Sequence, residues 1–216
     1  LPDKILSIPK YGSINLHASL LPDYRGAAPI QWALMNGETE TGVTTFHINS
    51  KVDYGDILAK ELVKISDKDN FQTLSKKLSE VGARIMLRTI NQIKNLDSKP
   101  IKQGDGSFKK APKITKDMFF INWNWTAEKI HNWIRGLSNM SFYWGKKRIK
   151  VYDTTFIKSV SISIPGRIYE KTKKSLIIET SDGLLSLREI QQEGKSKMLI
   201  EKFMVGNYQY DKNIII

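Results

Sequence analysis

The chain has 216 residues, of which 40% are apolar, no cysteine, and a formal net charge of +12 at pH 7. This composition is typical of a globular protein with one large domain or two modest ones. It excludes disulfide bridges, thiolate zinc sites and cysteine nucleophiles, and no apolar run is long enough to cross a bilayer. We therefore expect a cytoplasmic protein with no membrane attachment.

Residues 1–94 alternate between strand and helix patterns. Apolar/polar alternation and helical spacing predict strands at 13–17, 42–48 and 57–65 and helices at 27–36 and 70–93. Strands that alternate with helices are typical of an α/β layer. The chain starts with Leu1 rather than methionine, beside a strand with no unit before it. We therefore expect an N-terminally truncated chain.

Residues 95–118 are predicted to be a linker, because they are rich in Gly, Pro, Asn and Asp as far as 112 and show no periodicity. Beyond it, Thr126 is a suitable N-cap for a helix that ends at Leu137. Short alternating runs then predict strands at 149–157, 167–170, 175–180 and 184–189. Short strands with turn signals between them predict a small β-barrel over 119–216.

Basic residues outnumber acidic ones more strongly in the second half of the chain. Such an excess attracts polyanions, and nucleic acids above all. A lysine-rich surface that is merely solvated has the same composition. Charge alone therefore leaves both interpretations open.

The stretch Ser13–Gly26 carries the clearest chemistry. If it is extended, Asn15 and His17 share one face, because strand side chains alternate with period two. An Asn amide offers two donors and an acceptor, and an imidazole donates, accepts or exchanges a proton near neutral pH. Two such groups on one face suit acyl chemistry.

Several runs along the chain are long enough to compare with a known family. In the first part they are Asn15-Leu-His-Ala-Ser-Leu-Leu-Pro22, Arg25-Gly-Ala-Ala-Pro-Ile-Gln31, Glu40-Thr-Gly-Val-Thr44 and Val52-Asp-Tyr-Gly-Asp56. In the second part they are Ala111-Pro-Lys-Ile114, Trp123–Arg135, Lys150-Val-Tyr152, Pro165-Gly166, Thr180–Gly183 and Gln191–Lys195. These runs resemble the methionyl-tRNA formyltransferase family, in the family's order and over essentially the whole chain. The resemblance implies a partial Rossmann-like formyltransferase domain at 1–94, followed by an OB-like β-barrel at 119–216 that binds tRNA.

The resemblance also implies a site and a reaction. Three residues match the family's catalytic set: Asn15, His17 and Asp53. Four residues match a segment implied to contact the folate: Ser19, Leu20, Leu21 and Pro22. The implied reaction moves a formyl group from 10-formyltetrahydrofolate to the free amino group of methionyl initiator tRNA, for translation initiation. No metal is implied, and we expect a monomer.

Formyl transfer to an amine develops negative charge on the formyl oxygen, so donors aimed at that oxygen accelerate it. Loss of one such donor typically costs about a hundred- to thousandfold in rate. Asn15 and His17 are candidate donors, and His17 or a water held by Asp53 is a candidate general base. The sequence does not divide these roles. Taken singly, each residue also has a structural alternative, such as turn formation by an Asp near a Gly.

Basic residues of the second part are expected to contact RNA phosphates, which positions an RNA without reading its sequence. They are Arg135, Lys146, Lys147, Arg148, Lys150 and Lys195. Arg25 is a further RNA-binding candidate in the first part. It either binds a substrate phosphate or carboxylate or braces its own loop.

Two other functions stay open on the sequence. A sugar-nucleotide N-formyltransferase shares the Asn/His/Asp set and can carry a similar C-terminal domain. A catalytically incomplete tRNA-binding fragment is the second alternative, because the family's first strands and helices have no counterpart in this chain. The basic second half and the segment Gln191–Lys195 favour tRNA over a sugar nucleotide.

Overall fold

The computed structural model describes residues 2–158 and 164–207. Residues 159–163 and 208–216 of the predicted second domain therefore lie outside the described residues. The chain forms two compact units. The N-terminal unit comprises Leu1–Ala33 and Glu38–Ile114, and the C-terminal unit comprises Leu34–Gly37 and Thr115–Ile216.

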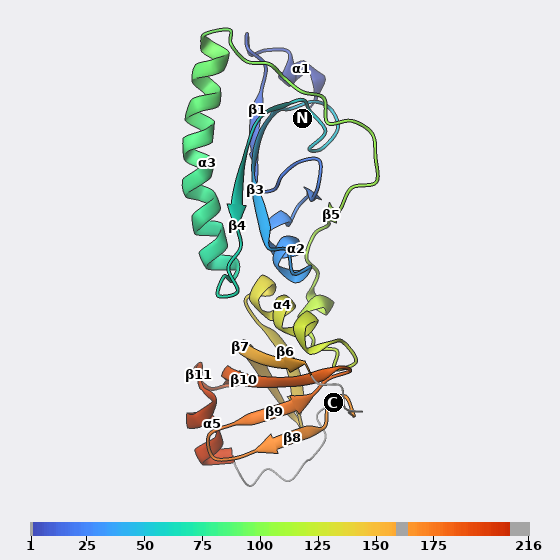
Figure 1. Cartoon of the computed structure of the whole chain (residues 1–216), viewed down its shortest axis with the longest axis vertical. Helices are drawn as coiled ribbons and strands as arrows, with labels where there is room; N and C mark the ends of the chain where they lie inside the picture. Colours follow the sequence, from blue (N-terminus) through green and yellow to red (C-terminus); the bar gives the residue numbers. More distant parts are fainter. Residues whose placement is uncertain (1, 159–163, 208–216) are drawn as a thin grey trace. The chain divides into compact units, whose positions relative to one another are not determined.

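The N-terminal unit is built on an antiparallel sheet in the order β1 (Ile14–His17), β3 (Glu40–His47) and β4 (Ile57–Lys64). The long helix α3 (Phe71–Lys94) covers one face of this sheet (Figure 1). Its first turn is capped by Asn70, whose side chain accepts a hydrogen bond from the Thr73 amide. Buried helix residues such as Leu74 and Leu78 recur at helical spacing and supply the core on this side.

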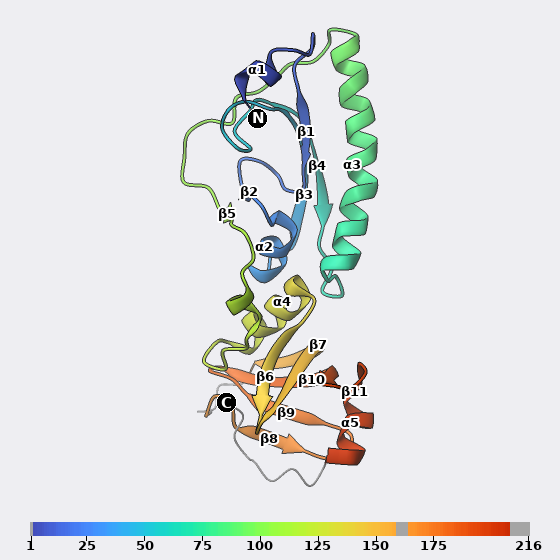
Figure 2. The ribbon, with the colours of Figure 1, turned by 180° about the vertical axis from the view of Figure 1, so that it is seen from behind.

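The opposite face of the sheet carries loops rather than a long helix, as Figure 2 shows. The short strands β2 (Arg25–Gly26) and β5 (Lys110–Ala111) pair there in parallel. The short helix α1 (Asp3–Leu6) belongs to this unit. Helix α2 (Pro29–Met35) begins in it, and its last two residues are counted with the C-terminal unit. Composition predicts a linker from residue 95 onward, yet Ile101 pairs with Ile57 and β5 pairs with β2. Residues 101–111 thus take part in the fold of the N-terminal unit.

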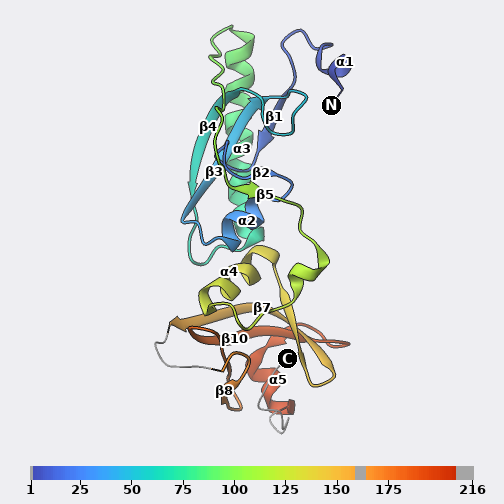
Figure 3. The same cartoon turned by 90° about the vertical axis from the view of Figure 1, so that its right-hand side faces the viewer.

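The C-terminal unit begins with the short 3₁₀ helix η1 (Lys116–Phe119) and helix α4 (Ala127–Leu137), which is capped by Thr126. A sheet follows in the order β6 (Met140–Trp144), β7 (Lys147–Lys158), β10 (Gly183–Gln192), β9 (Leu176–Glu179) and β8 (Ile168–Lys171). The strand β11 (Met198–Leu199) pairs with β10, and helix α5 (Ile200–Asn207) follows it. Helix α4 packs on β7 and β10, and α5 packs on β10 (Figure 3).

The predicted class, an α/β part followed by a β part, is confirmed. The sheet of the C-terminal unit is an open path among the described residues, since no pairing there joins β6 to β8. Closure into a barrel is thus not seen in these ranges. The core of the C-terminal unit is formed by fully buried side chains from its helices and sheet, among them Ile130, Met140, Val151, Leu185 and Met204.

Glu179, at the end of β9, is a carboxylate buried in the C-terminal unit, with a side chain 3% exposed. One oxygen accepts from Arg167 Nε and Nη2 at 2.9 and 2.6 Å, and the other from the Ile164 amide at 2.7 Å. Burial by itself raises the pKa of this carboxyl. The hydrogen bonds from Arg167 and Ile164, with the charge of Arg167, outweigh burial and hold the pKa below the ordinary value of 4.5.

A pKa that is lowered by folding gives stability that is complete above the ordinary value and is lost as the pH falls through the folded-state value. We expect Glu179→Gln to lower the free energy of unfolding by about 2 kcal/mol at pH 7, because it weakens hydrogen bonds to a charged group. The difference from the parent should shrink below pH 4.5, the ordinary value. Denaturant unfolding at neutral and acidic pH measures this, and a difference independent of pH would contradict it.

Candidate active site

Strand β1 places Asn15 and His17 on the sheet face away from α3. Leu16, between them, packs against Gly82 of α3, and neighbours along a strand point to opposite faces. The Asn15 Oδ1 atom accepts a hydrogen bond from the Leu16 amide at 2.9 Å. Within the described part of the chain, Asn15 Nδ2 makes no hydrogen bond to protein. The exposed amide therefore presents its two N–H donors outward.

His17 is buried at 6% exposure and held by a backbone carbonyl. Its Nε2 lies 2.8 Å from the Tyr24 oxygen. A carbonyl oxygen only accepts, so Nε2 carries the hydrogen in this bond. In the neutral form of the ring, the lone pair is then at Nδ1, which lies 3.8 Å from Asp53 Oδ2. This separation is too long for a hydrogen bond.

Asp53 lies in the loop between β3 and β4, with φ of 59° in the left-handed region. Its side chain is 11% exposed, and Oδ2 accepts a hydrogen bond from the Gly26 amide at 3.0 Å. Gly26 has φ of 126°, and a Cβ there would lie 2.4 Å from the Ala111 oxygen. Only glycine fits this position without a backbone shift. The pairing of β2 with β5 thus points the Gly26 amide at the Asp53 carboxylate.

With a neutral His17, two acceptors therefore lie side by side: His17 Nδ1 and Asp53 Oδ2. A group with two N–H donors placed beside this pair, such as an amine, can donate to both atoms. The free amide of Asn15 lies about 7 Å along the same strand face from His17, the spacing of residues two apart. The arrangement can accept protons from an amine and donate to an oxygen beside it.

The segment Ser19–Pro22 follows β1 and is held by Thr44. The Thr44 hydroxyl donates to the Ser19 oxygen at 2.6 Å and accepts from the Leu21 amide at 3.1 Å. The side chains of Ser19 and Leu21 are fully buried. A ligand can therefore meet Leu20 and Pro22, which are partly exposed, but not the other two residues, which have no exposed surface.

Arg25 follows in β2, and its guanidinium has partners inside the N-terminal unit. Nε and Nη2 donate to Gln103 Oε1 at 2.9 and 2.7 Å. The guanidinium carbon also lies 3.6 Å from the centre of the Tyr54 ring. The structure thus places this RNA-binding candidate in contact with the Asp53 loop.

Basic candidates of the C-terminal unit gather at one edge of its sheet. Lys146 and Lys147 lie at the turn from β6 to β7, just before Arg148. The amide of Glu193, which follows β10, donates to the Arg148 oxygen at 2.9 Å. The turn that holds Lys195 is therefore beside Arg148.

The two remaining basic candidates differ in their setting. Lys150 lies two residues after Arg148 and so on the same face of β7. Arg135 lies in the last turn of α4, where its Nε donates to Asn132 Oδ1 at 2.9 Å. The edge thus includes Lys146, Lys147, Arg148 and Lys195, with Lys150 next to it on β7. Arg135 belongs to a separate element.

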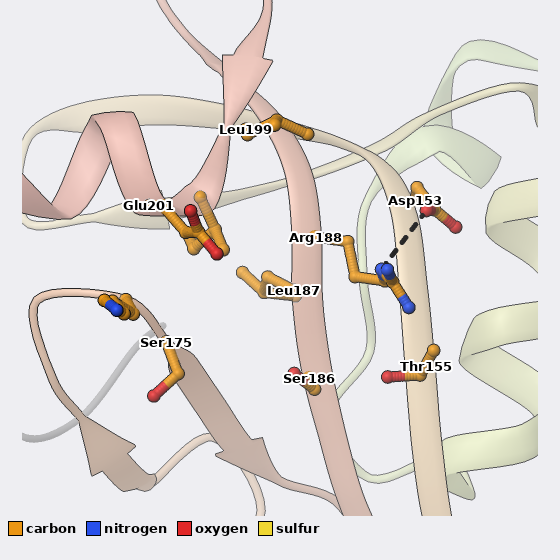
Figure 4. A pocket seen from close by; sticks show the side chains of 10 residues that line it. Asp153, Thr155, Ser175, Ser186, Leu187, Arg188, Leu199 and Glu201 are labelled. Atoms are coloured by element: carbon orange, nitrogen blue, oxygen red, sulfur yellow. Dashed lines mark ion pairs between the residues drawn. The ribbon is translucent and has the colours of Figure 1, made fainter.

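The C-terminal unit also contains a pocket of about 340 Å³ (Figure 4). Its lining residues are Asp153, Thr155, Lys174, Ser175, Ser186, Leu187, Arg188, Leu199, Ile200 and Glu201. The acidic and basic side chains balance, and one of each, Asp153 and Arg188, approach to 3.7 Å. The pocket therefore has no charge preference on which to assign a ligand.

Sequence patterns do not single out three groups at the site: the Tyr24 carbonyl, the Gly26 amide and the side chain of Gln103. The first two are backbone atoms, which no side-chain pattern marks. Gln103 lies in the stretch whose composition predicts a linker. Among the described residues, no group of His, Asp and Glu is arranged to hold a metal ion. Every helix in the same ranges is too short or too polar to span a lipid bilayer.

Residues 1–90 match the family model described as formyl transferase, and residues 113–208 match its C-terminal domain. A methionyl-tRNA formyltransferase of Caldanaerobacter subterraneus subsp. tengcongensis is 42% identical over 96% of this chain and 68% of its own length. That of Thermodesulfovibrio yellowstonii is 46% identical over 95% of this chain and 67% of its own length. The solved structure of WlaRD, a sugar 3N-formyltransferase with dTDP and 5-N-formyl-THF, matches with a TM-score of 0.66 and 25% identity, over 85% of this chain and 66% of that one.

The match of residues 1–90 to the formyl transferase model, together with a fold shared with a solved formyltransferase, defines the class of protein as a formyltransferase. The identity to curated relatives narrows the class. The chain belongs to the methionyl-tRNA formyltransferase family. It spans about two thirds of the length of those relatives, 68% and 67%.

Proposed function

We propose that this chain carries the catalytic residues for formyl transfer from 10-formyltetrahydrofolate to the free amino group of methionyl initiator tRNA. The observation that carries the proposal is the pair of acceptors, His17 Nδ1 and Asp53 Oδ2, 3.8 Å apart. An attacking amine donates its N–H groups to this pair. Most other acyl acceptors have a single proton to donate, so a double acceptor suits an amine best.

Asn15, His17 and Asp53 each have one role in the transfer. The amine nitrogen forms a bond to the formyl carbon, the bond from that carbon to folate N10 breaks, and the amine loses a proton. His17 Nδ1 takes that proton, a general-base role worth about a hundred- to ten-thousandfold in rate. Asp53 balances the positive charge that His17 carries until it passes the proton to folate N10, so that tetrahydrofolate leaves as a neutral amine. Asn15 Nδ2 donates to the formyl oxygen as its negative charge grows.

The folate co-substrate supplies the formyl group. WlaRD was solved with a formylated folate, and it shares this fold at 25% identity. In the present chain, Leu20 and Pro22 are the members of the predicted folate segment that keep partly exposed side chains. We assign the folate contact of this segment to these two residues.

Initiator tRNA is the acceptor that the basic edge of the C-terminal unit favours. Lys146, Lys147, Arg148 and Lys195 lie on two neighbouring turns, and their charges match a phosphate backbone. A sugar nucleotide carries two phosphates and gives no reason for an extended basic edge. The likeness to WlaRD nevertheless keeps an amino-sugar nucleotide as the second candidate.

A competition between acceptors tests the proposal. The complete product of the gene is assayed with 10-formyltetrahydrofolate and either methionyl initiator tRNA or an amino-sugar nucleotide. We expect a higher kcat/KM for the tRNA, and preference for the sugar would overturn the proposal. If the 216-residue chain itself bound tRNA but formed no formylated product in this assay, it would be an RNA-binding fragment.

Lys146→Gln and Lys195→Gln test the RNA contact in the same assay. Each should raise KM for tRNA with kcat unchanged, and each should reduce the slope of log KM against log salt by about 1, because one phosphate contact is lost. Lys94→Gln, at the exposed end of α3, is the matched charge control and should change neither quantity. Equal effects of all three variants would show that net charge, rather than the edge, matters.

A further inference from the structure

The side chain of Gln103 uses its full hydrogen-bonding capacity inside the N-terminal unit. Its Nε2 donates to the Asp53 oxygen at 2.9 Å and to the Gly55 oxygen at 2.7 Å. Its Oε1 accepts both Nε and Nη2 of Arg25. A primary amide has two donors and two acceptor lone pairs, and all four are engaged here. Such a group is held in one orientation and in turn holds its partners.

These contacts fix the Asp53 loop at three consecutive residues. Gln103 binds the carbonyls of Asp53 and Gly55, and the Arg25 guanidinium lies over the ring of Tyr54 between them, 3.6 Å from its centre. The loop is also pressed against β3, because a Cβ on Gly55 would lie 1.5 Å from the His47 oxygen. The backbone of Asp53 is thus held in its left-handed conformation from both sides.

Arg25 decides which way the Gln103 amide points. A guanidinium has only donors, so it must face the amide oxygen, which leaves the amide nitrogen to face the two carbonyls. Two parallel N–H groups on one oxygen require the planar fork of arginine, which lysine does not have. A single arginine therefore orients the amide and covers the tyrosine ring.

We propose that Arg25 and Gln103 are positioning residues that hold the Asp53 carboxylate against the Gly26 amide and opposite His17. The inference rests on the proposed function in one respect, the catalytic role of Asp53. It assigns Arg25 to the interior of the active-site loop rather than to an RNA phosphate. The segment 101–111 then also supports catalysis, because it holds Gln103 in place between the bridge of Ile101 with Ile57 and strand β5.

Steady-state kinetics of Gln103→Ala in the complete gene product test whether Gln103 positions the catalytic loop. We expect kcat to fall about 10- to 100-fold, the usual effect of a misplaced catalytic group, with KM for tRNA and for the folate unchanged. Gln103→Glu keeps an acceptor for Arg25 but loses both donors to the carbonyls, so it should be equally impaired. Ser107→Ala, an exposed position on the same segment, is the matched control and should keep full activity.

The coupling of the two residues distinguishes positioning from RNA binding. Arg25→Lys should lower kcat in the parent but have almost no further effect in Gln103→Ala, because both changes release the same loop. An arginine that contacts RNA would give another result. Its replacement would raise KM for tRNA, reduce the salt slope and add fully to the Gln103 effect, and that outcome would overturn the proposal.

Amide hydrogen exchange gives a readout that needs no activity. The Gly26 amide donates to Asp53 Oδ2, so its exchange rate reports where the carboxylate lies. We expect this amide to exchange at least about tenfold faster in Gln103→Ala and in Arg25→Lys, and unchanged in Ser107→Ala. Unchanged Gly26 exchange in both variants would refute positioning. A parent protein without formyl transfer, but with this exchange response, would support positioning and refute the proposed function.

Discussion

Replacement of His17 by Ala is expected to lower kcat for formyl transfer by about a thousandfold while leaving tRNA affinity nearly unchanged. The change removes the lone pair at Nδ1 and the charge partner of Asp53, and general-base catalysis is worth about a hundred- to ten-thousandfold. Single-turnover formylation with saturating tRNA measures the loss directly. Filter binding or anisotropy with the same tRNA measures affinity.

Two further variants separate the chemical role of His17 from its structural one. His17→Gln keeps an N–H that can donate to the Tyr24 oxygen, as Nε2 does now, but offers no basic nitrogen. It should fold normally and be as inactive as His17→Ala. His47→Ala, on β3 of the same sheet, is the control of the same residue type. An active His17→Gln enzyme would remove the imidazole from the mechanism.

Replacement of Gly26 by Ala is expected to abolish measurable turnover, with a loss of at least about a hundredfold in kcat. The new Cβ would lie 2.4 Å from the Ala111 oxygen, at a φ of 126° that L residues rarely adopt. The backbone must therefore shift, and the shift moves the amide that donates to Asp53 Oδ2. The backbone strain should also lower the free energy of unfolding by about 1 to 3 kcal/mol. Initial rates and denaturant titration measure the two effects.

Gly194→Ala is the matched control for backbone strain. Gly194 also has a positive φ, of 74°, but a Cβ there meets nothing within 4 Å. It should lose some stability and keep its turnover number. If Gly26→Ala were as active as Gly194→Ala, the contact between the Gly26 amide and Asp53 would have no part in catalysis.

The elements that could be predicted from sequence are those with a clear period. The strand pattern of 13–17 and the helical spacing of 70–93 correspond to β1 and α3 within a residue or so at each end. No alternation predicts strand β6, because four of the five residues in its run Met-Ser-Phe-Tyr-Trp are buried, on both faces of the strand. No cap signal predicts helix α5, because its eight residues follow directly on β11.

For the basic candidates, too, some features can be predicted from local sequence and others depend on strand pairing. Runs such as Lys146–Arg148 are visible as a charge cluster in the sequence. That Lys195 lies beside Arg148 depends on the pairing of β7 with β10, in which Gln192 is opposite Ile149. Strand pairing joins residues far apart in the chain, and its register is decided by packing rather than by local composition.

For the candidate site, the sequence alone determined that Asn15 and His17 share one strand face, because backbone geometry fixes a period of two wherever the chain is extended. The tertiary structure alone decided what surrounds them. Asp53 meets the Gly26 amide across 27 residues, and Gln103 meets Arg25 across 78. Contacts at such separations depend on the paths of the loops that carry Asp53 and Gly26, both at positive φ. The packing of the sheet, β2 and β5 sets these paths, and no local pattern of side chains encodes that packing.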